Sequence, residues 1–455
     1  MSENGNSKSF WATISDFFKN SKYVIVLVTL LVFLVLIEIS GLFNKARYQQ
    51  AGSTYHDYSG SDVRFTSSGQ PNPDFVKASG KCAQCHALET PAIIEQFSHS
   101  RHQQVGVSCI DCHRPVANQE KVGHKGFEIS KDITAQNCAQ CHGTQYEQFI
   151  RSRHGAPAWA AVVGRDGFTP EQIAFAEKYH KGAVDRDPNA LAKVEGEGTT
   201  VKGCMVCHQI GRPNSDGSIG NCTECHSYHR ASVRLARTPE TCGQCHLGPD
   251  HSQIEIFNSS KHGALFNAFK DDMNLDQRPN QLTTKDMPVP SCATCHMSGI
   301  NGQRFTHDTT ERLSYFLFAA ITEKRPNFES AQIQMKETCS KCHTSGHVDK
   351  FYKESELLVA EVNEKIKISL DLIAQAKKEG LMNDKPFDEK IDFLAFDIWH
   401  YFGRTAKHGA FMGGADYVQW HGTYEIHQKT IELEELIEKL REQKASGKVF
   451  SSKKY

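Results

Sequence analysis

The apolar residues of this 455-residue chain follow different patterns in different parts of the sequence. Near the N-terminus they form one nearly continuous run over residues 23–43, YVIVLVTLLVFLVLIEISGLF. After Tyr352 they recur every three or four residues, which is the spacing of amphipathic helices. Between these regions the most regular pattern is one of Cys and His. The sequence therefore divides into an apolar N-terminal run, a Cys- and His-rich middle and a helical C-terminal part.

The N-terminal run has the length of a membrane anchor. Its 21 residues, at about 1.5 Å each in a helix, just span the core of a bilayer. Lys8, Lys19 and Lys22 precede it, which favours an N-terminus inside the cell. A cleaved signal peptide is the alternative, but the run is longer than usual for one and no A-x-A-like cleavage site follows. We therefore predict a cytoplasmic segment at 1–22 and an uncleaved anchor at 23–43, which places the rest on the periplasmic side of the inner membrane.

Residues 44–80 and 353–455 are the flanks of the Cys- and His-rich middle. The first is rich in Ser, Gly and Pro and reads as a linker. The second contains two helical stripes, formed by Leu358, Val362, Ile366, Ser369 and Ile373, and by Leu433, Leu436, Ile437 and Leu440. The period alone does not decide whether these stripes pack on the middle region or on other subunits.

Every one of the 16 cysteines lies in a C-x-x-C-H motif, and there are eight such motifs. They are Cys82/Cys85/His86, Cys109/Cys112/His113, Cys138/Cys141/His142, Cys204/Cys207/His208, Cys222/Cys225/His226, Cys242/Cys245/His246, Cys292/Cys295/His296 and Cys339/Cys342/His343. In a c-type cytochrome the two sulfurs hold the porphyrin covalently and the His binds the iron from the proximal side. Zinc sites and redox dithiols are the alternatives, but eight copies with no Cys left over argue against both.

We therefore interpret residues 81–352 as an octahaem domain with a mainly α fold, in which the porphyrins supply much of the apolar core. Attachment of haem to Cys takes place outside the cytoplasm, in agreement with the predicted anchor. The formal net charge of −1 argues against a nucleic-acid partner.

A second His is needed for each iron that has two imidazole ligands, and a repeat suggests three of them. The pattern F-x-x-S-[RK]-H ends at His102, His154 and His262. His229 follows His226 by three residues, on the proximal side of that haem, so it is expected to reach a different iron. Of the 23 histidines, 15 lie outside the motifs, which permits either eight second ligands or seven with one open iron. His208 has no such partner nearby and is the candidate for the open iron.

The sequence resembles the octahaem hydroxylamine oxidoreductases and their nitrite-reducing relatives. The resemblance covers about residues 81–445 and is strongest in TCGQCHLGPDHSQIEIFNSSKHG, SCATCHMSGINGQRFTHDTTERLSYFLF and KHGAFMGGADYVQWHGTYE. It implies seven bis-histidine relay haems and one five-coordinate haem, held by Cys204, Cys207 and His208, that binds the nitrogen substrate. It also implies that Asp250 and His251 line the pocket on the open side. His307 resembles a distal ligand of the family, and Tyr315 is a weaker pocket candidate.

The resemblance also indicates reaction and partners. Interconversion of nitrite, hydroxylamine or ammonia moves several protons with the electrons, and a His beside a carboxylate is suited to carry them. Oxidative members of the family have a tyrosine that cross-links to the catalytic haem of a neighbouring subunit, and Tyr424 fits that position best. The predicted anchor and the short chain favour a reductase with a quinol-linked membrane partner or a soluble cytochrome c, and the family implies a homotrimer.

Two further classes of function stay open. In the first, all eight irons have two His ligands and the protein is an electron conduit between the quinone pool and periplasmic partners. In the second, the protein is an octahaem reductase of sulfur oxyanions, although that family lacks the three matching stretches.

Overall fold

The computed structural model describes residues 73–447 and the isolated positions 15, 32 and 35. The chain divides into two units, Met1–Asp62 and Val63–Tyr455. Almost all of the predicted cytoplasmic segment and of the predicted anchor at 23–43, and most of the predicted linker, lie outside the described residues. Among the residues that are described, no helix has both the length and the apolar character needed to cross a membrane.

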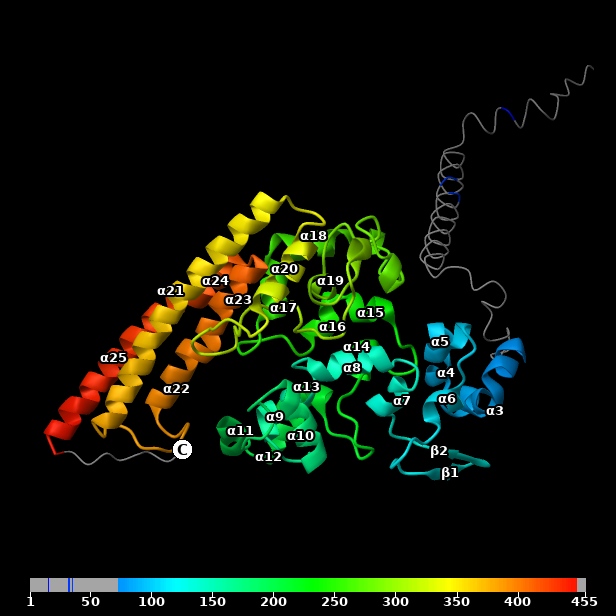
Figure 1. Cartoon of the computed structure of the whole chain (residues 1–455), viewed down its shortest axis with the longest axis horizontal. Helices are drawn as coiled ribbons and strands as arrows, with labels where there is room; N and C mark the ends of the chain where they lie inside the picture. Colours follow the sequence, from blue (N-terminus) through cyan, green and yellow to red (C-terminus); the bar gives the residue numbers. More distant parts are fainter. Residues whose placement is uncertain (1–14, 16–31, 33–34, 36–72, 448–455) are drawn as a thin grey trace, which may run out of the picture. The chain divides into compact units, whose positions relative to one another are not determined.

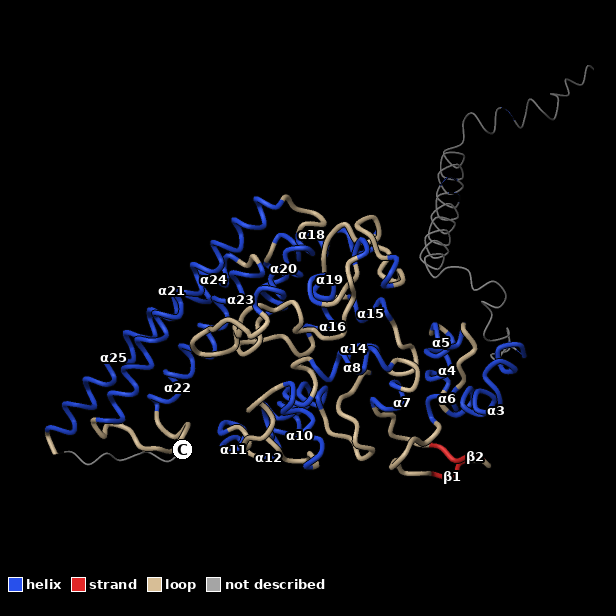
Figure 2. The backbone as a smooth tube through the Cα atoms, in the orientation of Figure 1, coloured by secondary structure: helices blue, strands red, loops and turns tan. Residues whose placement is uncertain are grey.

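The second unit is mainly α-helical, which confirms the predicted fold class (Figure 2). Its described residues contain a single small sheet, in which β1 (Val122–His124) pairs antiparallel with β2 (Phe127–Ile129). The α-helices before the C-terminal part are α3 (Pro73–Glu89), α4 (Pro91–Ser98), α5 (Arg101–Gln104), α6 (Cys109–His113), α7 (Ala135–Ala139), α8 (Gly143–Arg151), α9 (Ala156–Val163), α10 (Pro170–Tyr179), α11 (Ala190–Glu195), α12 (Glu197–Thr199), α13 (Met205–His208), α14 (Thr223–His226), α15 (Val233–Arg237), α16 (Pro239–Gly243), α17 (Gln253–Ser259), α18 (Lys261–Phe269), α19 (Cys292–His296) and α20 (Phe328–Cys339).

The helices of the C-terminal part are longer. They are α21 (Ser345–Lys378), α22 (Lys390–Phe396), α23 (Arg404–Met412), α24 (Ala415–Val418) and α25 (Tyr424–Ala445). Short 3-10 helices lie at Gln209–Gly211, Lys270–Asp272, Pro279–Gln281 and Ile300–Gly302, and the π-helices are η1 (Thr200–Cys204), η6 (Asp397–Gly403) and η7 (Gln419–Thr423).

The C-x-x-C-H motifs lie on or at the ends of helices, most of them short, and helix geometry brings their residues together. Residues three apart on a helix are neighbours on its surface, about 60° apart around the axis, so the two sulfurs of a motif lie side by side. The four helices α6, α13, α14 and α19 each end at a motif His. A capping box of Ser108 and Asp111 starts α6, and Ser291 with Thr294 does the same for α19. The local sequence therefore favours a turn at these motifs.

The two C-terminal stripes pack within the chain itself. Helix α21 runs beside α25, seen as the yellow and red helices of Figure 1. Val362 and Ile366 of α21 and Leu433 and Ile437 of α25 are buried in one apolar cluster with residues of α22, η6 and α23. The domain boundary predicted after Tyr352 falls inside α21. Helix α23 also contacts α17, so this helical region reaches the segment that follows the sixth motif.

Replacement of Ile366 by Ala should destabilise this cluster. Its side chain is fully buried, so the change leaves a cavity and should cost about 2–5 kcal/mol of unfolding free energy. The measurement is the midpoint of denaturant unfolding of the haem-loaded protein. The matched control is Ile368→Ala on the same helix, because Ile368 is 51% exposed and its loss should leave the midpoint nearly unchanged. Equal midpoints for the two variants would contradict the packing described here.

Candidate functional site

Six of the eight motif histidines face a second imidazole at a nearly constant distance, with interplanar angles from 17° to 56°. An iron with bonds of about 2 Å to two imidazoles separates their ring centroids by roughly 6 Å. The observed centroid distances are 6.0 Å for His86–His124, 6.5 Å for His113–His229, 6.0 Å for His142–His102, 6.2 Å for His226–His307, 5.8 Å for His246–His154 and 5.9 Å for His343–His262. The residues therefore fit bis-histidine haem irons at six motifs.

Serine N-caps in the local sequence fix the helical turns that carry two of these second histidines. In the F-x-x-S-[RK]-H repeat, the side chain of Ser100 accepts a hydrogen bond from the Gln103 backbone and that of Ser260 from the Gly263 backbone. Each Ser is thus the N-cap of the turn that carries the His. His229 has a positive φ of 59°, a strained conformation for a residue with a side chain, and such strain is common at functional sites.

The environment of the paired histidines suits neutral imidazoles. Burial lowers the pKa of His154 to about 4 and that of His307 to about 4. Six of the motifs, from the third to the eighth, contribute to the lining of one mostly apolar cavity of about 2660 Å³. That volume is several times the roughly 300–1,000 Å³ of an ordinary small-molecule pocket. A set of porphyrins with neutral imidazole ligands fits such a cavity.

Cys141 and Cys342, the second cysteines of the third and eighth motifs, do not line this cavity. Both are exposed, whereas Cys138 and Cys339, the first cysteines of the same two motifs, are half-buried and line it. Positions three apart on a helix differ by about 60° around its axis, so one sulfur can face the cavity while the other lies toward solvent. Cys141 and Cys342 therefore lie outside the cavity wall, and their bonds to haem stay a prediction from the motif.

The thiols of neighbouring motifs lie close enough to shift each other's pKa. This electrostatic influence links Cys82 to Cys109, Cys112 to Cys138 and Cys141, Cys138 to Cys222, Cys225 to Cys242, Cys242 to Cys292, and Cys295 to Cys339 and Cys342. Cys245 of the sixth motif also contacts Cys207 of the fourth. The thiols therefore neighbour one another in the order of motifs one, two, three, five, six, seven and eight, and the fourth motif neighbours the sixth.

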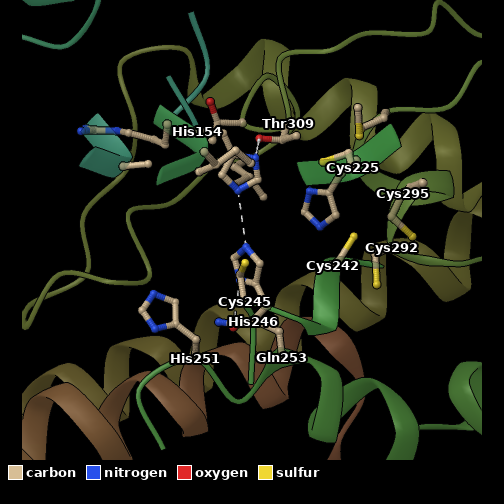
Figure 3. A pocket seen from close by; sticks show the side chains of 18 of the residues that line it. His154, Cys225, Cys242, Cys245, His246, His251, Gln253, Cys292, Cys295 and Thr309 are labelled. Atoms are coloured by element: carbon tan, nitrogen blue, oxygen red, sulfur yellow. Dashed lines mark hydrogen bonds between the residues drawn. The ribbon is translucent and has the colours of Figure 1, made fainter. Parts of the chain in front are cut away.

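The fourth motif differs from the six paired ones. The Nδ1 of His208 lies 2.5 Å from the carbonyl oxygen of Ala158, which fixes the ring and leaves Nε2 for a metal. The His251 ring lies 6.4 Å from the His208 ring at an interplanar angle of 79°, and 5.8 Å from the ring of His246. Figure 3 shows His251 beside His246, while His154 lies across from His246. His251 thus borders two haem positions.

Asp250 holds His251 and is itself held by residues of the C-terminal part. Its Oδ2 lies 2.5 Å from Nδ1 of His251, and its Oδ1 lies 2.8 Å from both Nδ1 of His400 and Nη1 of Arg404. Burial raises the pKa of the Asp250 carboxyl, but the hydrogen bonds from His251 and His400 outweigh burial and hold that pKa well below its usual range. Asp250 is therefore a fixed anion at the edge of the cavity.

The two predicted tyrosines lie in different surroundings. Tyr315 lines the cavity, and its hydroxyl donates a hydrogen bond of 3.0 Å to Oε1 of Glu356. Burial raises the pKa of Tyr315 above its ordinary value. Tyr424 starts α25, is 48% exposed and packs against Trp420 at 5.3 Å, outside the residues that line the cavity of its own chain.

Four residues near these sites were not predicted from the sequence. His124 and His408 are further candidate ligands, and His400 and Arg404 contact Asp250.

In the described part of the chain His296 has no ring partner near 6 Å, but His408 lines the same cavity. Its Nδ1 lies 2.8 Å from the carbonyl oxygen of Arg404, which leaves Nε2 for a metal, and burial lowers its pKa to about 3.

A sequence signal existed for one of these four. The tripeptide [RK]-H-G recurs at His154, His262 and His408, so the repeat extends further than the longer pattern indicated. His124 lies in a hairpin with no repeat around it. His400 and Arg404 lie about 150 residues after Asp250, and only the fold brings them to it.

The fold and these motifs define a multihaem cytochrome c, and comparison with known proteins gives its family. A family model described as "Seven times multi-haem cytochrome CxxCH" matches residues 103–385, more than half of the chain. The chain belongs to this family of multihaem cytochromes, so c-type haems are its cofactors and redox chemistry is its function.

Individual relatives agree with this class. A "probable nitrite reductase-hydroxylamine oxidoreductase fusion protein" of Kuenenia stuttgartiensis is 27% identical over 326 residues, covering 58% of this chain and 34% of that protein. The chain therefore spans about a third of that relative. A solved "hypothetical multiheme protein" superposes with a TM-score of 0.71 at 20% identity and covers 87% of this chain and 99% of its own. A chain of a "reducing HAO-like protein complex" of K. stuttgartiensis superposes with a TM-score of 0.61 at 18% identity, over 81% and 86%.

His124→Ala should convert one low-spin haem iron to high spin. The thioether bonds of Cys82 and Cys85 do not depend on His124, so the haem content should stay the same while the second ligand is lost. The readouts are haem content by pyridine haemochrome and the ferric EPR spectrum. His427→Ala on the exposed side of α25 is the control and should leave the spectrum unchanged. An unchanged spectrum for His124→Ala would rule out this ligand.

Proposed function

We propose that this protein is a membrane-anchored octahaem cytochrome c that catalyses multi-electron redox chemistry of small nitrogen compounds. In this proposal each of the eight motifs carries haem, seven irons have two His ligands and relay electrons, and the iron at His208 has an open side. The observation that carries it is the Asp250–His251 pair, which faces His208 from across the cavity.

The residues on the open side are suited to deliver protons. The haem, when bound, supplies the electrons and an open coordination position for the substrate. His251 uses Nδ1–H to bond the Asp250 carboxylate, so its Nε2 is left for the substrate side. Asp250 orients this imidazole and stabilises it when it is protonated, as a buried carboxylate does for a catalytic His. His251 is thus the proton donor or acceptor, and Asp250 is the residue that aims it.

We favour the reductive direction, from nitrite or hydroxylamine toward ammonia. The similarity to a chain of a reducing HAO-like complex supports this direction, whereas the name of the fusion protein contains both a nitrite reductase and a hydroxylamine oxidoreductase. The position of Tyr424 on the surface leaves it available to a neighbouring subunit, so a covalent bond to that subunit's haem stays a prediction. A strongly red-shifted band in the reduced absorption spectrum would indicate that bond and the oxidative direction.

The proposal also includes a location and partners. Residues 23–43 would anchor the protein on the periplasmic side of the inner membrane, where a quinol-linked membrane protein or a soluble cytochrome c would supply electrons. The homotrimer of the resembling family is proposed as the assembly.

An electron conduit is the second candidate function, and one observation favours it. The 6.4 Å between the His208 and His251 rings is within the range of the six other pairs, so a turn of His251 would close the open side. Reaction of the ferric protein with a small ligand distinguishes the two functions, because a fully bis-histidine protein offers no free iron position.

His251→Ala should retain all haems and lose most turnover. Removal of a catalytic acid or base typically costs about 10²–10⁴ in rate. The measurement is nitrite and hydroxylamine reduction with a dye donor, together with haem content. His421→Ala is a matched control, because His421 also pairs with an aspartate, Asp416, at 3.1 Å but on the surface. Wild-type turnover in His251→Ala would exclude the proposed pocket.

Turnover should show no step from Asp250 between pH 5 and pH 9. A carboxyl whose pKa is depressed in the folded protein is ionised throughout this range, and its contribution to stability is lost only as the pH falls through that depressed pKa. Asp250→Asn should instead lower turnover about 10- to 100-fold at every pH in the range. The check is the pH profile of kcat for both proteins. If kcat of Asp250→Asn equalled that of the wild type at pH 5, this would show that Asp250 is protonated at pH 5.

A further inference from the structure

The Asp250 carboxylate joins two regions that are far apart in the sequence. One oxygen, Oδ2, bonds to the adjacent His251. The other, Oδ1, bonds to His400 in the π-helix η6 and to Arg404 at the start of α23. The bonds to these three partners therefore restrict the movement of the carboxylate.

His400 and Arg404 reach the same oxygen from one continuous helical stretch, in which the π-helix η6 runs into α23. Short π-helical segments of this kind are frequent at functional sites. His400 and Arg404 are four residues apart and contact each other, with Nη1 of Arg404 2.7 Å from Nε2 of His400. Gly403 lies between them, and a Cβ there would come within 2.5 Å of the Ile366 side chain. Close packing of η6 on α21 thus fixes both residues toward Asp250.

Arg404 also fixes the other side of His251. Its Nε donates a hydrogen bond of 2.9 Å to the carbonyl oxygen of Phe318, and its guanidinium lies 5.1 Å from the Phe318 ring. That ring lies 5.1 Å from the ring of His251. The buried Lys407, one turn further along α23, donates to the carbonyl oxygens of Ala319 and Ala320. The chain that carries Phe318 is therefore bonded to α23 at three consecutive residues.

We propose that His400 and Arg404 are positioning residues for His251. They hold Asp250 and Phe318 in place, so that His251 keeps Nδ1–H toward Asp250 and presents Nε2 to the side of the cavity opposite His208. This inference rests on the proposed function, because the orientation matters only if the haem at His208 is open.

The hydrogen-bond pattern around His400 is consistent with this role. Burial lowers the pKa of His400, which favours the neutral ring. A neutral ring can donate from Nδ1 to Asp250 and accept at Nε2 from Arg404, which is the pattern observed. Phe396 stacks on the ring at 3.9 Å and Trp399 lies edge-on at 4.8 Å, so the groups around His400 leave its ring little freedom.

Cyanide binding to the ferric protein tests the orientation without turnover. Hydrogen cyanide must give up its proton when the anion takes the open position, and an oriented Nε2 of His251 is the acceptor. His400→Leu removes the donor to Asp250, whereas His400→Asn keeps an N–H near the position of Nδ1. We expect the rate of cyanide binding, followed by absorption and by loss of the high-spin EPR signal, to fall about 10- to 100-fold in His400→Leu and Arg404→Met, the usual range for loss of such supporting bonds.

His400→Asn should recover most of the lost rate, and His421→Ala should bind cyanide like the wild type. Haem content and low-spin signals, measured on each variant, show whether it is folded. Wild-type rates in His400→Leu, or an equally slow His400→Asn with full haem content, would overturn the positioning role. A wild-type protein that binds no cyanide would instead overturn the proposed open haem, so the two failures can be told apart.

Discussion

The bond between an iron and two imidazoles is the constraint on which the rest of this structure depends. It requires that a motif His and a second His from another segment lie about 6 Å apart and face each other. The chain meets this requirement six times with partners drawn from a hairpin, loops and the starts of short helices. The short helices and long loops follow from this requirement, because each segment has to pass over a flat porphyrin rather than pack on a neighbouring helix.

Much of this arrangement is predictable from the sequence, and the reason is local. The mainly α fold, the c-type haems and three of the second histidines follow from motifs in which a few neighbouring residues determine both conformation and chemistry. Ser100 and Ser260 illustrate this, since each caps the turn that bears a His. The C-terminal stripes were also recognised, although their period left the packing partner open, and they pack on each other.

The rest depends on contacts between distant residues, which a single sequence does not encode in a readable way. His124 has no motif around it, and it pairs with His86 only because a hairpin folds back. His400 and Arg404 look like ordinary helix residues until η6 turns them toward Asp250. Tyr315, a pocket candidate from the sequence, lines the cavity, and its hydroxyl bonds to Glu356, a residue of the long helix α21 that only the fold brings to it.

The exposure of individual motif cysteines is also set by the fold rather than by the motif. All eight motifs share one local pattern, yet Cys141 and Cys342 are exposed while Cys225 and Cys295, at the same motif position, line the cavity. The pattern determines that two sulfurs and an imidazole lie together on one turn. Which of the sulfurs is covered depends on the segments that pack around that turn, and these come from elsewhere in the chain.

The contacts between cysteines have a consequence for how electrons would be distributed. In the described chain the thiol of Cys207 faces Cys245, while motifs on either side of the sixth continue the row. If each motif carried a haem and the haems followed this order, the circuit would be a line with one side branch at the sixth motif. Electrons bound for a haem at His208 would then cross the sixth position, whichever end of the line received them. The other haems would act as a reservoir, from which a reaction that consumes several electrons could draw them in quick succession.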